Sequence, residues 1–173
     1  GVLYGSHDDP DGETREFYRM IGARIAEFPL TRRAAAAAHS MMSPVIMGAP
    51  NVVRGKSQAG NVSALALVAE GLCDVLVSDY HIPALPQAVW SLVDRGVMSL
   101  PQAWALVSSR PAEILRLSDR GRLDPGLRAD LVVVHAQTRV IEATITAGRL
   151  TYLAGEAAER FVAQPKALSL AAE

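Results

Sequence analysis

A histidine and two carboxylates follow the first apolar segment of the chain. His7 comes after residues 2–4, which predict a short strand, and Asp8 and Asp9 follow it directly. Imidazole is a common metal ligand, and neighbouring carboxylates fix the orientation of such a ligand. His7 is therefore a candidate metal ligand, and Asp8 and Asp9 are candidates to hold it in place. The alternative is a solvated polar loop that opens a helix, because aspartates are favourable at helix N-termini.

An aspartate follows the most continuous apolar run in the first half of the chain. Residues 75–77 are Val-Leu-Val, and Ser78 and Asp79 come next. Such a run predicts a parallel strand that is covered on both faces, and the carboxyl ends of these strands carry the chemistry in α/β barrels. Asp79 is therefore a candidate catalytic residue, with capping of the next helix as the alternative. His81 is a candidate orienting group or substrate contact, or an ordinary loop histidine.

The segment 48–61 combines three glycines with two cations, Arg54 and Lys56, and with amide and hydroxyl side chains. We expect a loop here. Small residues let backbone N–H groups approach an anion, and an arginine can bind phosphate oxygens through two nitrogens. The segment is thus a candidate phosphate-binding loop, although its glycines do not have P-loop spacing. The alternative is a flexible loop with two solvated cations.

Composition narrows the function classes. The 173 residues are 50% hydrophobic and carry a net charge of -1, so there is no basic surface of the kind that binds nucleic acid. No apolar run approaches the roughly 20 residues that span a bilayer, which predicts no membrane partner. Cys73 is the single cysteine and lies in apolar surroundings; we expect an inert core thiol and a reducing, cytoplasmic location. Homo-oligomerisation stays open.

Strand and helix patterns alternate in the first part of the chain and give way to strands alone. Strands are predicted at 2–4, 23–28, 45–47, 75–77, 131–134, 140–146 and 150–153, and helices at 14–21, 63–70, 83–95 and 111–117, after Thr31 and after Ser99. Thr31 and Asn61 are expected helix caps, Ser99 with Gln102 is a capping-box pattern, and Ala147-Gly148 is an expected turn. The alanines at 34–38 should let their helix pack closely against a sheet. We predict an α/β region at 1–118, a small β lobe at 119–162 and a tail at 163–173. The chain begins without Met, inside a predicted strand, so we expect a piece of a longer polypeptide.

The passages SSRPAEIL and DRGRLDPGLRADLVVV resemble the C-terminal signature of the metal-dependent amidohydrolase superfamily. The resemblance implies the C-terminal part of a TIM-like (β/α)8 barrel, followed by strands of a small β-sandwich lobe. Gly121 and Gly126 then permit tight turns, and Asp130 anchors the entry into a strand.

The motifs SHDD, EFP, MGAPNVVRG, QAGN and SDY, in that order, resemble the phosphonate metabolism protein M family of that superfamily. The resemblance implies a phosphorylated sugar substrate: hydrolysis of alpha-D-ribose 1-methylphosphonate 5-triphosphate to the 5-phosphate and pyrophosphate, in the carbon–phosphorus lyase pathway. Two positions depart from the family pattern. Gln58 stands where a histidine is expected, and Lys56 stands where a glycine is expected.

The superfamily pattern also implies roles for the candidate residues. By order, His7 matches the histidine after the sixth barrel strand and Asp79 the aspartate after the eighth; both would bind one or two divalent ions, zinc or another transition metal. Asp79 would also accept the proton of the attacking water. Arg54 and Lys56 would neutralise the phosphates, and Asn51 and Ser57 would donate hydrogen bonds.

No His-x-His pair of the first barrel strand occurs in the chain, so we expect the chain alone to be inactive. Two alternatives remain open at this point. One is an amidohydrolase that acts on a C–N bond, as a cyclic amidase or a deaminase. The other is a barrel relative that serves as a non-catalytic scaffold.

Overall fold

The computed structural model describes residues 2–57 and 59–162. The chain divides between Leu117 and Ser118 into two compact units. The predicted tail at 163–173 and Gln58 lie outside the described residues. Within residues 2–57 and 59–162, no helix has the length and apolar character needed to cross a bilayer.

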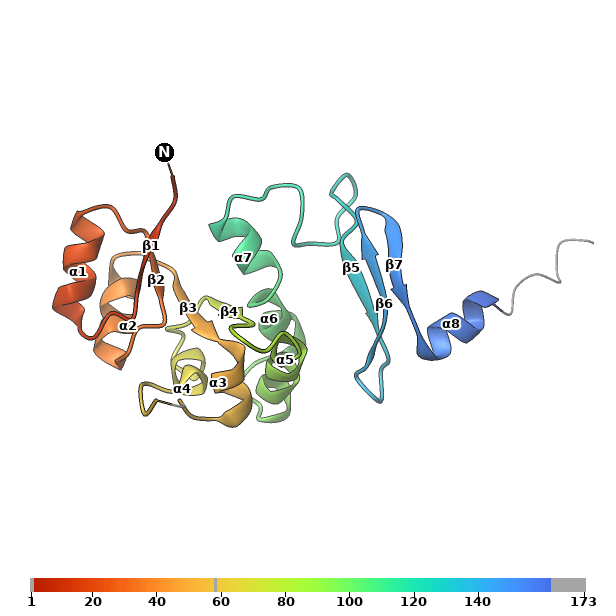
Figure 1. The fold of residues 1–173 in the computed structure, drawn as a ribbon, viewed down its shortest axis with the longest axis horizontal. Helices are drawn as coiled ribbons and strands as arrows, with labels where there is room; N and C mark the ends of the chain where they lie inside the picture. Colours follow the sequence, from red (N-terminus) through yellow and green to blue (C-terminus); the bar gives the residue numbers. More distant parts are fainter. Residues whose placement is uncertain (1, 58, 163–173) are drawn as a thin grey trace, which may run out of the picture. The chain divides into compact units, whose positions relative to one another are not determined.

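The first unit is built on a parallel sheet of four short strands (Figure 1). The strands are β1 (Gly5–His7), β2 (Ile25–Glu27), β3 (Val45–Gly48) and β4 (Val75–Val77), and they lie side by side in chain order. His7 pairs with Glu27, and Gly48 pairs with Val77. Because all four strands are parallel, their carboxyl ends meet along one edge of the sheet, where the candidate residues lie.

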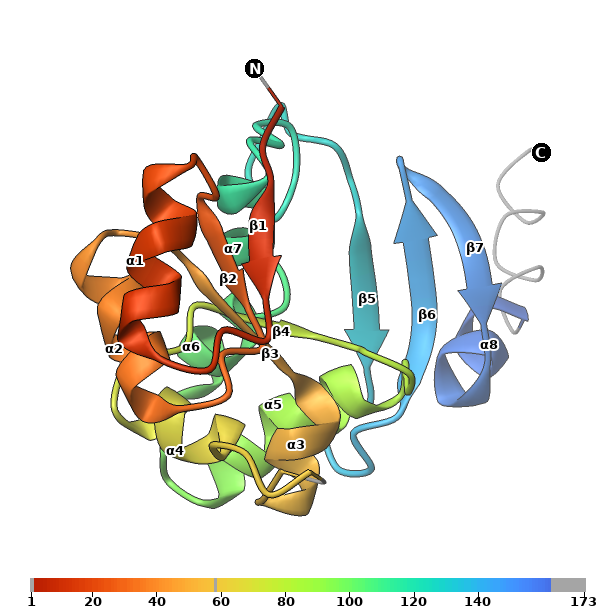
Figure 2. The ribbon, with the colours of Figure 1, turned by 60° about the vertical axis from the view of Figure 1, so that its left-hand side comes forward.

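Helices connect and follow these strands (Figures 1 and 2). They are α1 (Gly12–Met20), α2 (Arg32–Ser40), α3 (Ala49–Arg54), α4 (Ala64–Ala69), α5 (Ala84–Asp94), α6 (Leu100–Ala105) and α7 (Ser109–Ile114). The predicted cap Thr31 is confirmed, because its hydroxyl accepts the Ala34 N–H at 3.1 Å. The capping box of Ser99 and Gln102 is confirmed as well. The mixed α/β fold with a parallel sheet is therefore as predicted.

Small and branched apolar side chains form the core between the sheet and the helices. Ala34, Ala35 and Ala38 of α2 are fully buried, so the polyalanine helix approaches the sheet closely, as expected. Val45 and Leu76 contribute from the strands. Cys73 is buried and free, and burial raises its pKa to about 12, which fits the predicted inert thiol.

Three local predictions are corrected by the structure. The first strand is Gly5–His7 rather than residues 2–4. The segment 48–61 begins with helix α3 rather than with loop, because Pro50 suits the first turn of a helix and the buried Val52 anchors it to the core. Helix α4 is capped by Ser63 and not by Asn61.

The second unit contains an antiparallel sheet of β5 (Leu131–Val134), β6 (Ile141–Thr146) and β7 (Arg149–Leu153), followed by helix α8 (Gly155–Val162). The predicted turn at Ala147 and Gly148 is confirmed, with both residues at positive φ. Asp130 accepts the Ala147 N–H at 2.8 Å, which ties the entry of β5 to this turn. Helix α8 was not predicted; the Glu142 carboxylate accepts N–H groups of its first turn.

Candidate functional site

Left-handed backbone conformations mark the carboxyl edge of the parallel sheet. Asp8 and Phe28, which directly follow β1 and β2, have φ angles of 59° and 51°, and Asp79, two residues after β4, has a φ of 53°. A non-glycine residue in this region costs about 1 kcal/mol or more, and such residues cluster at functional sites. The strand ends are thus held in conformations that their residues do not favour.

A cavity of about 190 Å³ lies at this edge. Five of the residues singled out from the sequence line it, namely Asp8, Asn51, Arg54, Ser57 and Asp79. Met47, Gly48, Phe28, Pro29, Leu30, Ala59, Asn61, Val62 and Tyr80 complete the lining. The cavity therefore brings together residues that are far apart in the chain: Asp8 and Asp79 are separated by 71 positions.

The Asp79 carboxylate lies at the end of the neighbouring strand β3. A methyl group built on Gly48 would lie 3.4 Å from Asp79 Oδ2 and 3.8 Å from Asp79 Cβ. The first distance is at the tight limit of ordinary van der Waals contact, so the carboxylate lies directly beside the backbone of Gly48. Asp79 itself is exposed and is available to a ligand in the cavity.

His7 is flanked by two carboxylates and an aromatic ring. Its Nδ1 lies 3.1 Å from Asp8 Oδ2, and its Nε2 lies 4.0 Å from Glu27 Oε2. The Phe28 ring meets the imidazole edge-on, with 5.2 Å between the ring centroids. The three polar side chains are about half exposed, at 54%, 55% and 42% of their surfaces, so the imidazole is open to solvent on one side.

The donor set for a metal is only partly present in the described residues. Imidazole and carboxylate are suitable ligands for a divalent transition metal. Within residues 2–57 and 59–162, however, no group of three or more His, Cys, Asp or Glu side chains is close enough to hold an ion. His7 ends β1 and Asp79 follows β4, which are the outer strands of the sheet; at the usual strand spacing the axes of these two strands are roughly 14 Å apart.

The strand order also changes one assignment. The expected match of His7 to the sixth barrel strand and Asp79 to the eighth allows only one strand between them. The structure places two, β2 and β3, between β1 and β4. If Asp79 follows the eighth strand, His7 follows the fifth and Glu27 the sixth. Both intervening strands were predicted from the sequence, at 23–28 and 45–47, but the match by motif order did not count them.

Arg54 and Tyr80 form a pair at the cavity. Arg54 Nη1 donates a hydrogen bond to Tyr80 Oη, and its guanidinium carbon lies 5.9 Å from the centroid of the tyrosine ring. Among the ion pairs of the described residues, none joins Arg54 to a carboxylate. A cation that is held by a neutral side chain keeps its charge available for an anionic ligand.

The other predicted binding residues differ in their positions. The Asn51 side chain accepts the Ala64 N–H at 3.0 Å and donates to Val62 O at 3.4 Å, so it mainly fixes the start of α4 beside the cavity. Ser57 lines the cavity. Lys56 and His81 are exposed and do not belong to the lining.

Tyr80 and Asn61 line the cavity, but the sequence did not predict either of them as a site residue. Tyr80 follows Asp79 directly in the SDY motif, and this position next to a candidate catalytic residue could have identified it. Asn61 was interpreted only as a helix cap.

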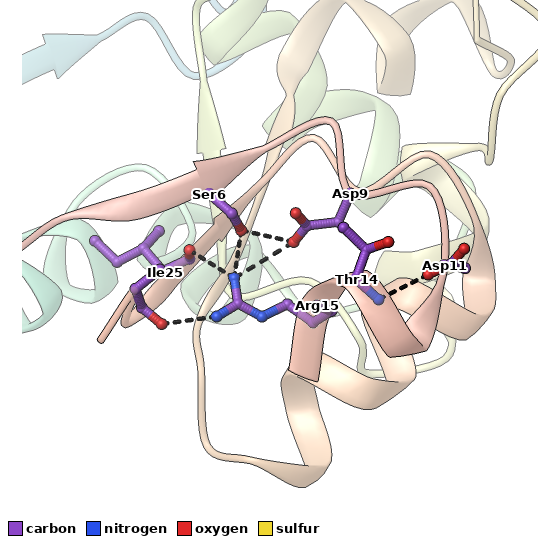
Figure 3. Close-up of polar contacts among 7 residues, drawn as sticks. Ser6, Asp9, Asp11, Thr14, Arg15 and Ile25 are labelled. Atoms are coloured by element: carbon purple, nitrogen blue, oxygen red, sulfur yellow. Dashed lines mark hydrogen bonds and ion pairs between the residues drawn. The ribbon is translucent and has the colours of Figure 1, made fainter. Parts of the chain in front are cut away.

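Asp9 departs from the role expected for it. Its carboxylate is buried and faces Ser6 and Arg15, not His7 (Figure 3). The physical reason is the left-handed conformation of Asp8, which breaks the alternation of side chains at the end of β1 and turns the next residue inward.

Solved structures with a similar fold include an amidohydrolase and a dipeptidase. A crystal structure of an amidohydrolase matches with a TM-score of 0.67 and 16% identity, over 90% of this chain and 46% of that one. The beta-aspartyl dipeptidase of Fervidobacterium islandicum AW-1, solved with a beta-Asp-Leu dipeptide, matches with a TM-score of 0.62 and 13% identity, over 82% of this chain and 44% of its own. At these identities the solved structures show the fold alone; together with the sequence relative described next, they support a C-terminal portion of an amidohydrolase-superfamily protein.

The sequence relative is the alpha-D-ribose 1-methylphosphonate 5-triphosphate diphosphatase of Escherichia coli (strain K12). It is 43% identical to this chain over 136 residues, which are 78% of the chain and 36% of the relative. No protein-family model matches the chain. The chain thus spans 36% of the length of this relative and a little under half the length of the solved structures.

Proposed function

We propose that the complete protein hydrolyses alpha-D-ribose 1-methylphosphonate 5-triphosphate to the 5-phosphate and pyrophosphate. The similarity to the diphosphatase supports this reaction, as does the arrangement of the cavity. In this proposal the described parallel sheet belongs to a TIM-like (β/α)8 barrel, with residues 1–118 in the barrel and 119–162 in a β-sandwich lobe. In the complete protein, the other barrel strands would come from a segment that corresponds to the part of the relative that this chain does not match.

The observation that carries the proposal is the position of Arg54 beside Asp79 in one cavity. A triphosphate carries several negative charges, and its hydrolysis depends mainly on positioning and on neutralising those charges. Arg54 offers two parallel N–H donors to phosphate oxygens, and the Tyr80 hydroxyl orients it. Ser57 provides a further hydroxyl in the lining. A site for a neutral amide substrate would not need this cation.

His7 and Asp79 would supply part of a divalent metal centre in the complete protein, with Asp8 and Glu27 beside the imidazole. Zinc or another divalent transition metal, as one or two ions, suits these donors. When bound, such a metal lowers the pKa of water and polarises phosphoryl oxygens. Asp8 would hold the tautomer of His7 that leaves Nε2 free as a ligand.

The chemistry assigned to this chain is a single displacement at phosphorus. Asp79 accepts a proton from the attacking water, whose oxygen forms the new bond to phosphorus. The anhydride bond between the first and second phosphoryl groups breaks, and pyrophosphate leaves with its electron pair. Arg54 holds the phosphate oxygens on which charge develops. Lys56, which lies outside the lining, contributes only through its charge at longer range.

A substrate screen on the complete gene product tests the proposal. We expect pyrophosphate release from the ribose triphosphate, and no ammonia or ring opening from cyclic amides or from amino-substituted heterocycles. C–N cleavage without pyrophosphate release would contradict the proposal and would favour an amidase or deaminase of the same fold. Failure of every substrate, together with no bound metal, would favour the scaffold.

A further inference from the structure

A buried arginine lies beneath the strand end that carries His7. Arg15 of α1 is fully buried, and so are its partners Asp9 and Ser6, at 1% and 7% exposure (Figure 3). Arg15 Nη1 donates to Ser6 Oγ, to Asp9 Oδ2 at 3.3 Å and to Ile25 O at 3.1 Å. Its Nη2 donates to Ala23 O at 2.7 Å. One side chain therefore links helix α1 to both β1 and the start of β2.

The same segment is fixed a second time through its backbone. The Asp8 N–H donates to Glu27 O at 3.0 Å, and the Leu30 N–H donates to Asp9 O at 2.9 Å. Ser6 Oγ also donates to Asp9 Oδ2 at 2.6 Å. His7 and Asp8 thus lie between Ser6 and Asp9, whose side chains both contact Arg15. The segment joins the loops after β1 and β2, which both line the cavity edge.

Stability alone does not explain this arrangement. Asp9 Oδ1 and Arg15 Nε are buried without a hydrogen-bond partner in the described part of the chain. Buried ion pairs are often no more stabilising than apolar residues of similar volume, and incompletely satisfied ones less so. A core residue such as Met or Leu would fill the same space. What an apolar pair could not do is hold Ser6 and Asp9 in one register.

We propose that Arg15 is a positioning residue, which holds Ser6 and Asp9 so that His7 and Asp8 keep their place at the carboxyl edge of the sheet. The consequence for catalysis rests on the function proposed above, whereas the effect on the strand end does not. Groups that orient metal ligands typically change metal affinity or activity by about 10- to 100-fold when they are lost.

The test uses the complete gene product and a paired substitution, Asp9→Leu with Arg15→Met, which removes both buried charges together. We expect a folded protein whose Asp8 and Leu30 amide hydrogens exchange at least tenfold faster, with amides of α5 unchanged. We expect kcat for the triphosphate to fall about 10- to 100-fold with KM little changed, and zinc affinity to fall in the same range. The matched control replaces the exposed Glu13–Arg33 ion pair of α1 and α2 by two glutamines, and should change neither readout.

Unchanged exchange at Asp8 and Leu30 would overturn the proposal, whatever the activity. Faster exchange with wild-type kcat and zinc affinity would overturn it too, since the segment would then move without consequence. A wild-type protein that fails to hydrolyse the triphosphate would remove the proposed function, and the exchange and zinc measurements would still decide the role of Arg15. If the paired variant does not fold, Arg15→Lys replaces it, because one ammonium cannot reach all four acceptors; wild-type values of exchange and kcat in Arg15→Lys would overturn the proposal.

Discussion

The Asp79 carboxylate lies directly beside Gly48, at the end of the neighbouring strand. A methyl group on Gly48 would lie 3.4 Å from Asp79 Oδ2. The two residues stand at the ends of the paired strands β3 and β4, and both line the cavity that contains Arg54. This relationship connects the backbone of one strand with the proposed base on the next.

Gly48→Ala should therefore impair catalysis with little effect on folding. Gly48 has a φ of -75°, which alanine adopts without strain, so the effect comes from the contact with Asp79. We expect kcat to fall by no more than about threefold, since a methyl group at the tight limit of ordinary contact moves the carboxylate little, whereas a displacement of about an ångström can cost up to 100-fold. Gly12→Ala is the control, because its methyl would make similarly ordinary contacts, at 3.5 Å and beyond, that do not involve Asp79. Equal kcat values for the two variants would contradict this reading.

Asp79→Asn removes the proposed proton acceptor while keeping the size of the side chain. We expect kcat to fall by roughly 100- to 10,000-fold, the usual range for loss of general acid–base catalysis. Because Asp79 is exposed, the melting temperature should change little. Steady-state kinetics and thermal unfolding measure the two effects. Normal turnover in Asp79→Asn would exclude Asp79 as the base.

Arg54→Gln should weaken binding of the triphosphate. The substitution removes the charge at the cavity, and we expect KM to rise about 10- to 100-fold, in line with about 1.5–3 kcal/mol for a hydrogen bond to a charged group. Tyr80→Phe removes the hydroxyl that accepts from Arg54 and keeps the ring, so a smaller rise is expected. Lys56→Gln is the matched control, because Lys56 lies outside the lining and should change KM less than threefold. A larger effect at Lys56 than at Arg54 would reverse the two assignments.

Cys73 should make the protein less stable at alkaline pH. Burial raises the thiol pKa from 9.0 to about 12, so the unfolded chain loses this proton first as the pH rises. The thiol's contribution is complete below pH 9 and is lost between pH 9 and 12, by about 1.4 kcal/mol per pH unit. Urea unfolding of the wild type and of Cys73→Ala, compared at pH 8 and pH 10.5, isolates this effect from other groups. Parallel losses of stability in both proteins would show that Cys73 is not the source.

The parts of the fold that were predicted correctly depend on local physics. The apolar run 75–77 is strand β4, and Thr31 caps α2, because burial on two faces and an unpaired helical N–H are both visible in a short stretch of sequence. Helix α3 was not predicted because Gly48 and Pro50 indicate a loop when burial is unknown. In the structure, the buried Val52 anchors this segment to the core as a helix. Helix α8 was missed because its first turn is capped by the distant Glu142.

The site was predictable only in part, because its geometry depends on contacts between strands. Asp79 and Arg54 were found as strand-end and loop residues, and they do share a cavity. The contact between Asp9 and Arg15 could not be predicted, because the left-handed conformation of Asp8 reverses the alternation of side chains expected along an extended strand. The two strands between His7 and Asp79 were predicted from the sequence, whereas their side-by-side order in the sheet required the structure.

The most direct test of the proposed reaction is phosphorus NMR of the complete gene product with alpha-D-ribose 1-methylphosphonate 5-triphosphate, with and without a chelator. We expect a pyrophosphate signal and a 5-phosphate signal to grow together, the chelator to abolish both, and zinc or another divalent transition metal to restore them. An unchanged triphosphate spectrum in the presence of bound metal would contradict the diphosphatase assignment.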